Sequence, residues 1–489
     1  MKSIKTLEEL AKEAKEYKAL GKKIGLCHGS YDVLHAGHIE HFTEAKKICD
    51  ILYVTITADK YILKHGKPVL SSERRAKHLL HLSCVEGVAI VNDYSAVPAI
   101  EAVKPDFYIK GKEYENLNQD ATKKIYKEKD TVEKNGGALY FTSDKIVFSS
   151  TKIQAEQGVG PYIPLDLNIS LEEVRDALAK MRTLKVAVLG ELITDRWTSV
   201  EQTGVSSKAL CPAVHTTLSV NQVGGSGAVA RHIANFVKEI RLFSNRSSEK
   251  IPKNIAFEPI DDGKFIITRY WVPSESKRLF EKKDITIKEM KKSYIKKIER
   301  YKPDILIIAD FGNGLISYPL AKEIIDYLSG KLSIGIMVQA NSSNFGFNRL
   351  DKYSNADLYV FDEREANLLL GHISTNVDDL LMKCSEKLQF RKNKKKIYIT
   401  RGRHGASLLF GSKSKHKILN VPNLVRSTID TIGCGDAFYS LACLCHAANI
   451  SPKLSLKLAN MAGAVCTQWL CNENSITPQH LLDVAKVVE

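Results

Sequence analysis

The sequence predicts an α/β protein built from two doubly wound domains, each a parallel sheet with helices wound around it. Short apolar runs suited to strands alternate with helical stretches along the chain. The length of 489 residues exceeds one ordinary hydrophobic core and suggests two or three domains. Glycine-rich turns stand where apolar runs give way to helical patterns, in both halves of the chain.

The composition is that of an ordinary soluble protein, with 44% hydrophobic and 26% charged residues. Residues 1–23 form a charged amphipathic pattern rather than a secretory signal, and no apolar run approaches the roughly 20 residues that a membrane-spanning helix needs. The ten cysteines include no CxxC pair, so neither a zinc site nor a disulfide framework is indicated. We therefore expect a cytoplasmic protein with reduced cysteines.

The chain is basic, with 71 Lys and Arg against 56 Asp and Glu and a net charge of +15. Such a charge suits nucleic acid, but it equally suits anionic nucleotides and sugar phosphates. The basic run at 391–396 lacks interleaved aromatic residues, which favours a solvated loop, and no nucleic-acid-binding motif is present. We expect neither nucleic acid nor a membrane as a partner.

In the first half of the chain, strands are expected at 24–28, 51–57, 87–91, 106–109 and 138–142. Binding sites of doubly wound sheets lie beyond the carboxyl ends of the strands. The first strand therefore delivers the stretch 29–38, GSYDVLHAGH, to such a site, and the strand that ends at Ile109 delivers Lys110.

His35 and His38 are three residues apart and are expected on one face of the first turn of a helix. The N–H groups and dipole of a helix N-terminus favour phosphate, and Gly37 lets a nucleotide approach the backbone closely. Two imidazoles here would stabilise the charge that develops when the α-phosphate of a nucleoside triphosphate is attacked. The alternative is that both histidines only cap the helix.

Several segments, GSYDVLHAGH (29–38), 45–59, KPVLSSERR (67–75), KGKEY (110–114) and FSSTKI (148–153), resemble the HxGH cytidylyltransferase-like nucleotidyltransferases. KGKEY is closer to the ADP-heptose synthase branch than to the glycerol-3-phosphate cytidylyltransferases. The resemblance implies a Rossmann-like fold with His35 and His38 as catalytic residues. The residues that it implies for binding nucleotide and phosphate are Gly29, Ser30, Tyr31, Lys46, Arg75, Lys110, Ser149, Ser150 and Thr151.

Each of the outlying positions also has a plainer explanation. Lys46 fits an ordinary surface lysine, Arg75 fits a helix-surface ion pair, and Ser149 to Thr151 fit an N-cap cluster.

A stretch that mixes glycine and proline and then starts a helix separates the two halves at about 155–184. Ser170 and Glu173 have the spacing of a capping box. We therefore predict a first domain at 1–158, a linker helix within 159–184 and a second domain at 185–489.

The informative element of the second domain is DTIGCGD, residues 430–436, which leads into an apolar helical stretch. Backbone N–H groups around Gly433 and Gly435 can hold an anion, and Asp436 beside them can take a proton from a hydroxyl group. A glycine-rich helix start with Asp436 as the N-cap is the alternative.

Together with VAVLGELITDR (186–196), ADFGNGL (309–315) and TRGRHGASLLF (400–410), this element resembles the PfkB, or ribokinase-like, carbohydrate kinases. The resemblance implies a second Rossmann-like domain of ribokinase-like fold, with Asp436 as the catalytic base and the glycines as an anion hole. It further implies Mg²⁺ as cofactor and ATP (or CTP) as the nucleotide substrates of the two domains. The remaining positions are Asp195, Gly224 and Gly225 for the sugar, Glu365 for Mg²⁺, and Thr400, Arg401 and Gly402 for ATP.

The second domain departs from the family pattern at four places, which indicates a changed substrate or a lost activity. Ala228 replaces the sugar-facing Asn, Asp362 the Asn of NxxE, Asn313 the Lys of DYxKG, and Gln339 begins the tract that is usually DPK. The order of the two domains is also the reverse of that in the heptose enzymes.

These patterns favour a bifunctional enzyme that phosphorylates a sugar and joins a sugar phosphate to a nucleotide, with an ADP-heptose-like product and release of pyrophosphate. The alternative is a single-activity cytidylyltransferase for an alditol or amino-alcohol phosphate, with a non-catalytic kinase-like domain. A nucleoside triphosphate and a sugar phosphate are the expected partners, and we expect a homodimer.

Overall fold

The computed structural model describes residues 3–62, 68, 70–111, 124–142, 160–209, 211–247, 249–272, 277–340, 346–388, 395–412 and 415–489. The chain divides into two compact units, Met1–Asp166 with Pro478–Glu489, and Leu167–Thr477. The helix that we expected in a linker falls in the second unit, and the last helix of the chain groups with the first. The domain limits 1–158 and 185–489 stay predictions.

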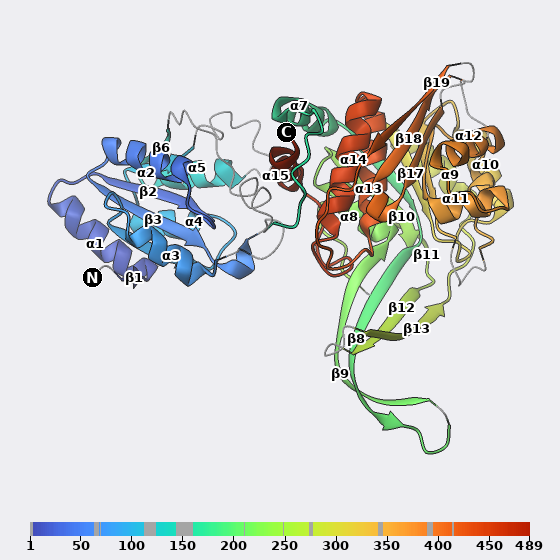
Figure 1. Ribbon diagram of the computed structural model, residues 1–489, viewed down its shortest axis with the longest axis horizontal. Coiled ribbons are helices and arrows are strands. Elements are labelled where there is room, and N and C mark those ends of the chain that lie inside the picture. The colour runs from blue at the N-terminus through green and yellow to red at the C-terminus, as the bar shows by residue number, and fades with distance from the viewer. Residues whose placement is uncertain are drawn as a thin grey trace. The chain divides into compact units, whose positions relative to one another are not determined.

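The first unit contains a six-stranded parallel sheet in the order β1-β4-β3-β2-β5-β6 (Figure 1). All five strands expected from the sequence are present. The strands are β1 (Ile4–Lys5), β2 (Ile24–Gly29), β3 (Ile51–Thr57), β4 (Gly87–Val91), β5 (Phe107–Lys110) and β6 (Ala138–Phe141).

Helices cover both faces of this sheet, as a doubly wound fold requires. These helices are α1 (Leu7–Ala19), α2 (Ala36–Ile48), α3 (Ser72–Leu80), α4 (Val97–Val103) and α5 (Lys124–Lys134). The terminal α15 (Pro478–Val488) is grouped with this unit as well. One core cluster joins the sheet to α1, α4 and α5, and a second joins it to α2 and α3. β2 pairs with β3 on one side and with β5 on the other, so the strand order of the sheet reverses at β2. In doubly wound sheets, ligands bind at the carboxyl ends of the strands at such a point.

The second unit has a nine-stranded central sheet in the order β11-β10-β7-β14-β15-β16-β17-β18-β19. Neighbouring strands are parallel from β11 to β17. β18 pairs antiparallel with β17, and β19 pairs antiparallel with β18. Its strands are β7 (Lys185–Gly190), β10 (Glu239–Asn245), β11 (Ala256–Asp261), β14 (Ile305–Asp310), β15 (Ser333–Val338), β16 (Leu358–Asp362), β17 (Lys395–Thr400), β18 (Ala406–Gly411) and β19 (His416–Val421).

Eight helices described in this unit wind around the central sheet. They are α7 (Leu171–Met181), α8 (Ser226–Ala234), α9 (Ser293–Tyr301), α10 (Tyr318–Leu328), α11 (Glu363–Leu370), α12 (Val377–Lys387), α13 (Cys434–Ala447) and α14 (Pro452–Cys466). One large core cluster joins the sheet to α9, α10, α11 and α12. The capping box expected at Ser170 and Glu173 starts α7, with Glu173 N–H donating to Ser170 Oγ at 3.1 Å.

A second, smaller sheet extends from this unit and is not packed into the central sheet (Figure 1). It consists of β8 (Leu192–Val205), β9 (Pro212–Gly225), β12 (Phe265–Val272) and β13 (Lys277–Ile285), in the order β13-β12-β8-β9. We call these four strands the small sheet. Across the described part of the chain, no helix combines the length and the apolar character needed to cross a membrane.

Candidate functional sites

The two histidines of the HxGH motif lie at the start of α2, directly beyond β2. His35 is the extended N-cap residue, so α2 begins at Ala36 and places His38 in its first turn. The two rings stack, with centroids 3.8 Å apart and planes 22° apart. Both residues are half-buried, and three of their four ring nitrogens, His35 Nδ1 and Nε2 and His38 Nδ1, are shielded from solvent.

Tyr31 forms the wall behind this pair. Its backbone has a φ of 45°, in the left-handed region, and its buried ring meets the edge of the His38 ring at 5.2 Å and the Phe42 ring at 5.0 Å. The ring also lies over Gly29, where an added Cβ would come within 2.9 Å of Tyr31 Cζ. A glycine at the end of β2 is therefore needed to let Tyr31 support His38.

Lys110 lies at the end of β5, beside the end of β2, as the sequence predicted. Its Nζ donates to the His28 carbonyl at 3.3 Å and lies 3.7 Å from Glu128 Oε2. Glu128 is buried and also accepts from the Tyr108 hydroxyl at 2.8 Å. Burial acts to raise its pKa, but Lys110 and the hydrogen bonds outweigh this and hold the pKa of Glu128 below its usual range.

Arg75 is fully buried, and its guanidinium group donates to four protein oxygens. They are Leu70 O at 3.0 Å, Thr57 O at 3.0 Å, Asp59 Oδ1 at 2.5 Å, and Ser30 O. Ser30 belongs to the HxGH turn, so Arg75 fastens this turn to β3 and to the start of α3. The predicted contact of Arg75 with phosphate stays a prediction, and the visible role of the residue is to hold the turn.

Lys46 is not brought close to the histidines. It occupies the last turn of α2, roughly 12 Å along the helix axis from His38, and donates to Asp50 O. With Ile39 and Thr43 it lines a surface cavity of about 310 Å³ on the outer side of α2. Ser149, Ser150 and Thr151 lie outside the described residues.

In the second unit, the DTIGCGD turn starts α13 as expected. Gly433 is the N-cap residue with a φ of 84°, and Asp436 lies in the first helical turn. Burial, and then the negative charge of Asp195, raise the pKa of Asp436 to about 7. A carboxyl group with such a pKa suits general-base chemistry near neutral pH.

Asp195 is buried on β8, and both of its carboxylate oxygens have partners. Arg269 Nη1 donates to Oδ1, and Asn472 Nδ2 donates to Oδ2 at 3.1 Å. Arg269 also donates from Nε to Glu281 at 3.1 Å. Burial raises the pKa of Asp195 despite these contacts. The expected sugar ligand is therefore held in an internal ion pair.

Gly224 and Gly433 both face Asn472, and Gly224 also faces Asp195. A Cβ on Gly224 would lie 2.0 Å from Asp195 Oδ2, and a Cβ on Gly433 would lie 2.5 Å from Asn472 Oδ1. Gly225, with a φ of 59°, leads into α8, where Ala228 is buried. The structure therefore gathers the predicted sugar and phosphate residues at one place. Sequence reasoning missed Asn472 and Arg269, which lie in no glycine-rich motif.

A second buried acidic group lies where β7 and β14 end side by side. Glu191 accepts from the N–H groups of Phe311 and Asn313 at 2.7 and 3.0 Å, and burial, with the nearby Asp310, raises the pKa of Glu191 to about 7. Asp310 accepts from Lys352 Nζ at 2.6 Å. These contacts hold the turn that contains Asn313.

The residues predicted for ATP and Mg²⁺ meet at the ends of β16 and β17, where Asp362 pairs with Thr400. Gly402 follows in a short turn, and Arg401 Nε donates to Glu363 at 3.1 Å. Glu365 accepts from Asp362 N–H at 3.1 Å and Ala340 N–H at 3.3 Å, and burial raises its pKa to about 8.

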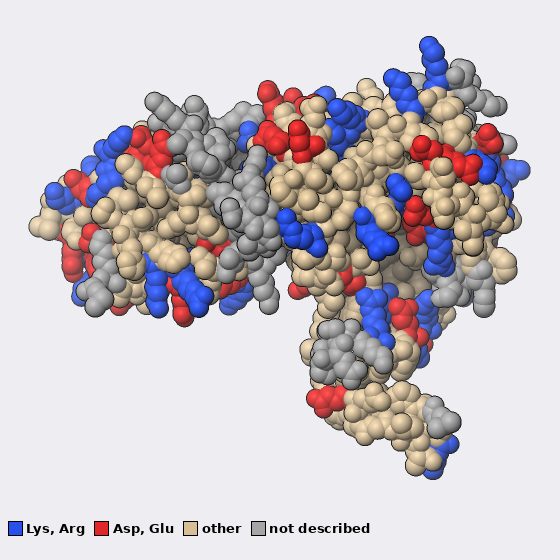
Figure 2. All heavy atoms as spheres, in the orientation of Figure 1, with Lys and Arg blue, Asp and Glu red and all other residues tan. Residues whose placement is uncertain are grey.

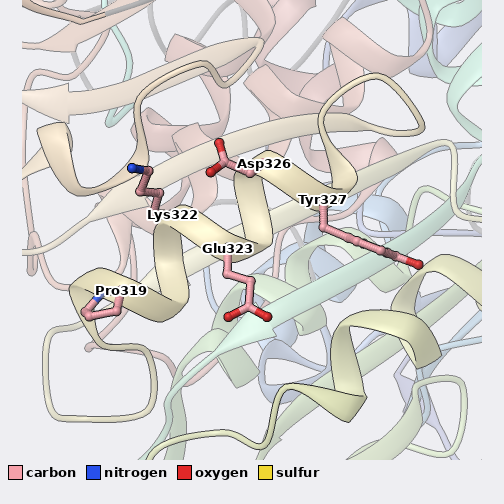
Figure 3. Close-up of a pocket in the computed structure, with 5 residues that line it drawn as sticks. All are labelled: Pro319, Lys322, Glu323, Asp326 and Tyr327. Carbon is pink, nitrogen blue, oxygen red and sulfur yellow. The ribbon is translucent and has the colours of Figure 1, made fainter.

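Among the described residues, neither a cluster of metal ligands nor a surface cavity adds a further site at these positions. Within the described stretches, no three His, Cys, Asp or Glu side chains gather as metal ligands. A surface cavity of about 420 Å³ lies elsewhere, along α10, and Figure 3 shows five residues that line it. Its Glu323 forms a 2.5 Å ion pair with Lys292, so this cavity lies among surface charges and away from the predicted residues.

Two family models match parts of the chain. Residues 26–156 match the cytidylyltransferase-like family, and residues 334–475 match the pfkB family of carbohydrate kinases. The chain thus carries a cytidylyltransferase-like region followed by a pfkB-like region.

Among curated proteins, the bifunctional protein HldE of Aliarcobacter butzleri is 35% identical over 115 residues, 23% of this chain and 24% of that protein. HldE of Hyphomonas neptunium is 30% identical over 157 residues, 32% of this chain and 31% of that protein. The chain therefore spans less than a third of the length of these relatives, and the match lies in its N-terminal part.

Among solved structures, the ribokinase of Arabidopsis thaliana, in complex with ribose and ATP, is similar with a TM-score of 0.48 and 11% identity. The alignment covers 62% of this chain and 99% of that one. Phosphofructokinase-2 of Escherichia coli gives a TM-score of 0.49 and 14% identity, and covers 62% and 98%.

Proposed function

Because a cytidylyltransferase-like region precedes a pfkB-like region in this chain, we propose that it is a bifunctional enzyme: a sugar kinase and a sugar-phosphate nucleotidyltransferase. The observation that carries the proposal is the stacked, half-buried pair of His35 and His38 at the N-terminus of α2, with Lys110 at the end of the adjoining strand.

In the first unit, an oxygen of a sugar phosphate attacks the α-phosphorus of a nucleoside triphosphate. The new P–O bond forms as the bond to the β-phosphate oxygen breaks, and pyrophosphate leaves. The imidazoles of His35 and His38, at the positive end of the α2 dipole, stabilise the charge on the oxygens of the reacting phosphate. No covalent intermediate with the protein is needed.

In the second unit, Asp436 accepts the proton of a sugar hydroxyl group. The hydroxyl oxygen then attacks the γ-phosphorus of ATP, ADP leaves, and the N–H groups beside Gly433 and Gly435 stabilise the transferred group. The raised pKa of Asp436, about 7, supports its role as the base.

We include Mg²⁺ in the proposal as the ion that ATP carries. Mg²⁺ commonly takes most of its ligands from phosphates and water, with one or two carboxylates from the protein. Glu365 does not offer a ready ligand, because both of its oxygens accept backbone N–H groups. We therefore assign no step to the ion. When bound, it would neutralise phosphate charge.

We propose an ADP-heptose-like product, because of the KGKEY element at 110–114 and the similarity to HldE proteins. ATP is the preferred nucleotide for both units, with CTP the alternative for the first. We further propose a cytoplasmic homodimer, supported by exposed apolar side chains on the small sheet. These are Val205, Leu218, Val220 and Phe280.

One observation favours a second candidate function, a single-activity cytidylyltransferase with a non-catalytic kinase-like domain. Arg269 and Asn472 occupy both oxygens of Asp195, and Ala228 provides no polar group in α8. If this arrangement persists with substrates, the sugar loses two of its expected ligands.

The experiment that tests the proposal measures both products separately in the full chain. ADP release is measured with ATP, Mg²⁺ and a panel of pentoses, hexoses, heptoses and their phosphates, and pyrophosphate release with ATP or CTP and sugar 1-phosphates. We expect His38→Ala to lower pyrophosphate release by about 10²–10³-fold and to leave ADP release unchanged. Asp436→Ala should do the reverse.

Two outcomes contradict the proposal. If both variants lose both activities together, the two sites are not independent. If ADP release is the same background in the wild type and in Asp436→Ala with every sugar, the second candidate function replaces the first.

A further inference from the structure

The candidate kinase site rests on a closed ring of contacts between the small sheet and the loops at the end of α14 and the start of α13. Asp195 contacts Arg269 and Asn472, and Asn472 adjoins Gly433. Cys471 N–H, one residue away, donates to Asp430 Oδ2 at 3.1 Å. The ring is then closed from Asp430 back to the small sheet.

Arg278, on β13, closes this ring. Its Nη2 donates to Asp430 Oδ1 at 3.0 Å, although the two residues are 152 positions apart in the chain. The guanidinium carbon of Arg278 lies 5.2 Å from the centroid of the Trp197 indole ring, and that of Arg269 lies 5.6 Å from the same centroid. Arg278 is thus anchored at two points beside the DTIGCGD turn.

The pairing leaves Arg278 with unused binding capacity. Its side chain is 44% exposed, whereas that of Asp430 is 6% exposed. Asp430 does not depend on Arg278, because it also accepts the N–H groups of Thr431 at 2.7 Å and Ile432 at 3.3 Å. A guanidinium group has five N–H donors in a planar fork that matches phosphate, and the ion pair uses one of them.

The charges around the site also call for such a group. Arg269 is committed to two carboxylates, Asp195 and Glu281. Asp436 and Asp195 are both acidic, so a phosphate that entered beside Asp436 would meet two negative charges. Arg278 is a partly exposed cation that the structure holds against the turn.

From these observations we infer that Arg278 binds a phosphate group of a substrate in the second unit, reaching it from the small sheet. The inference rests on the proposed kinase function and deepens it. Two sources of phosphate fit: the γ-phosphate of ATP, and a phosphate already carried by the sugar. In either case the small sheet supplies a charged residue to the site.

The test compares Arg278→Ala and Arg278→Lys with the wild-type chain. The control is Lys282→Ala, which removes a surface ion pair with Asp284 from the same strand. Calorimetry measures the affinity for ADP and for a non-hydrolysable ATP analogue with a γ-phosphate. ADP release is followed with D-fructose, D-fructose 6-phosphate, D-ribose and D-ribose 5-phosphate. Thermal unfolding reports the structural effect of each change.

If Arg278 binds the γ-phosphate, Arg278→Ala lowers the affinity for the ATP analogue by about 10-fold or more and leaves the affinity for ADP unchanged. If the phosphate of the sugar is bound, both nucleotides keep their affinity and KM rises for the sugar phosphates alone. Arg278→Lys should retain part of either effect, and Lys282→Ala should match the wild type.

Equal affinities and KM values in the wild type and Arg278→Ala overturn the inference, as does an equal loss for ADP and the analogue together with a lower unfolding temperature. The last result would mean that Arg278 only holds the Asp430 loop. A wild-type chain that binds neither nucleotide in this unit and releases no ADP overturns the kinase proposal itself, whatever the Arg278 variants do.

Discussion

At the scale of single residues, burial and partners decide what a charged side chain does. Arg75 and Arg278 are chemically identical, yet Arg75 is enclosed by four acceptor oxygens and Arg278 is 44% exposed beside a glycine-rich turn. The sequence could not separate these cases, because it gives the residue type and its spacing but not the carbonyl groups that surround it.

The contacts of Arg75 predict a structural effect. Arg75→Met removes the donors of several buried acceptors, so we expect the first unit to lose about 3 kcal/mol of unfolding free energy. Urea unfolding followed by circular dichroism measures this. Arg74→Met, at the exposed neighbouring position on α3, is the matched control and should change stability by less than about 0.5 kcal/mol. A stable Arg75→Met protein with a raised KM for the triphosphate would instead indicate phosphate binding.

Asp436 carries a prediction about pH. Its pKa is raised to about 7, and it acts as a base when deprotonated. The rate of ADP release should therefore rise with pH, be half-maximal near pH 7 and fall about tenfold for each further unit below it. A profile of kcat against pH from 5 to 9 measures this. A flat profile over that range would contradict the role of Asp436 as the base.

The raised pKa of Asp436 also affects the stability of the fold, which should fall as pH rises, whereas the rate of ADP release should increase. The pKa of Asp436 is higher in the folded chain than in the unfolded chain, so the folded state binds more protons between about pH 4 and pH 7. Its contribution to stability therefore falls as pH rises through this window. Asp436→Asn should raise the unfolding temperature more at pH 8 than at pH 4, by about 2–4 °C for each kcal/mol regained.

At the scale of elements, the N-terminus of α13 depends on two glycines that differ in their surroundings. Gly433 has a φ of 84°, and a Cβ there would lie 2.5 Å from Asn472 Oδ1. Gly435 has open space around the corresponding position. Alanine at 433 therefore strains the backbone and displaces Asn472, whereas alanine at 435 meets no protein atom.

These surroundings predict different results for the two substitutions. Gly433→Ala should cost about 1–3 kcal/mol of stability and abolish ADP release. Gly435→Ala should leave stability within about 1 kcal/mol of the wild type, and it should lower kcat if phosphate approaches the backbone at this residue. Thermal unfolding and ADP release, measured on the same samples, test both. Equal stability losses would contradict the steric account.

The elements themselves were largely predictable. Five of the six strands of the first unit and the starts of α2, α7 and α13 were expected, because periodicity, caps and glycine turns are local signals. The two-residue β1 was not. Much of the small sheet was not, because β8 and β9 are long strands without a continuous apolar run, and much of β9 and the end of β8 are exposed. Contacts such as Asp195 with Arg269, 74 positions apart, arise from packing and have no local signature.

At the scale of the whole molecule, charge does not single out one binding surface. The chain has a net charge of +15, but on the face shown in Figure 2 Lys and Arg are interspersed with Asp and Glu. Local arrangements of cations, such as Lys110 by β2 and Arg278 by the DTIGCGD turn, are therefore better candidates for the proposed phosphate recognition than the overall charge is.

The proposed homodimer gives the last prediction. The β8–β9 hairpin projects from its unit, and much of its far end is uncharged in Figure 2. On this hairpin Val205, beside the tip, is 64% exposed, and Leu218 and Val220, two residues apart on β9, are 59% and 47% exposed. If a second copy covers them, the double variant Leu218→Glu with Val220→Glu buries charge at the contact and should raise the dimer dissociation constant by at least about tenfold. Sedimentation equilibrium across a concentration series measures this, and Ile373→Glu, at an 87% exposed apolar side chain outside the small sheet, is the control.

Pyrophosphate release should stay unchanged in both variants, because His35 and His38 belong to the other unit. A wild-type chain that sediments as a monomer at all concentrations, or a double variant that dimerises like the wild type, would contradict the assignment of the interface to this hairpin.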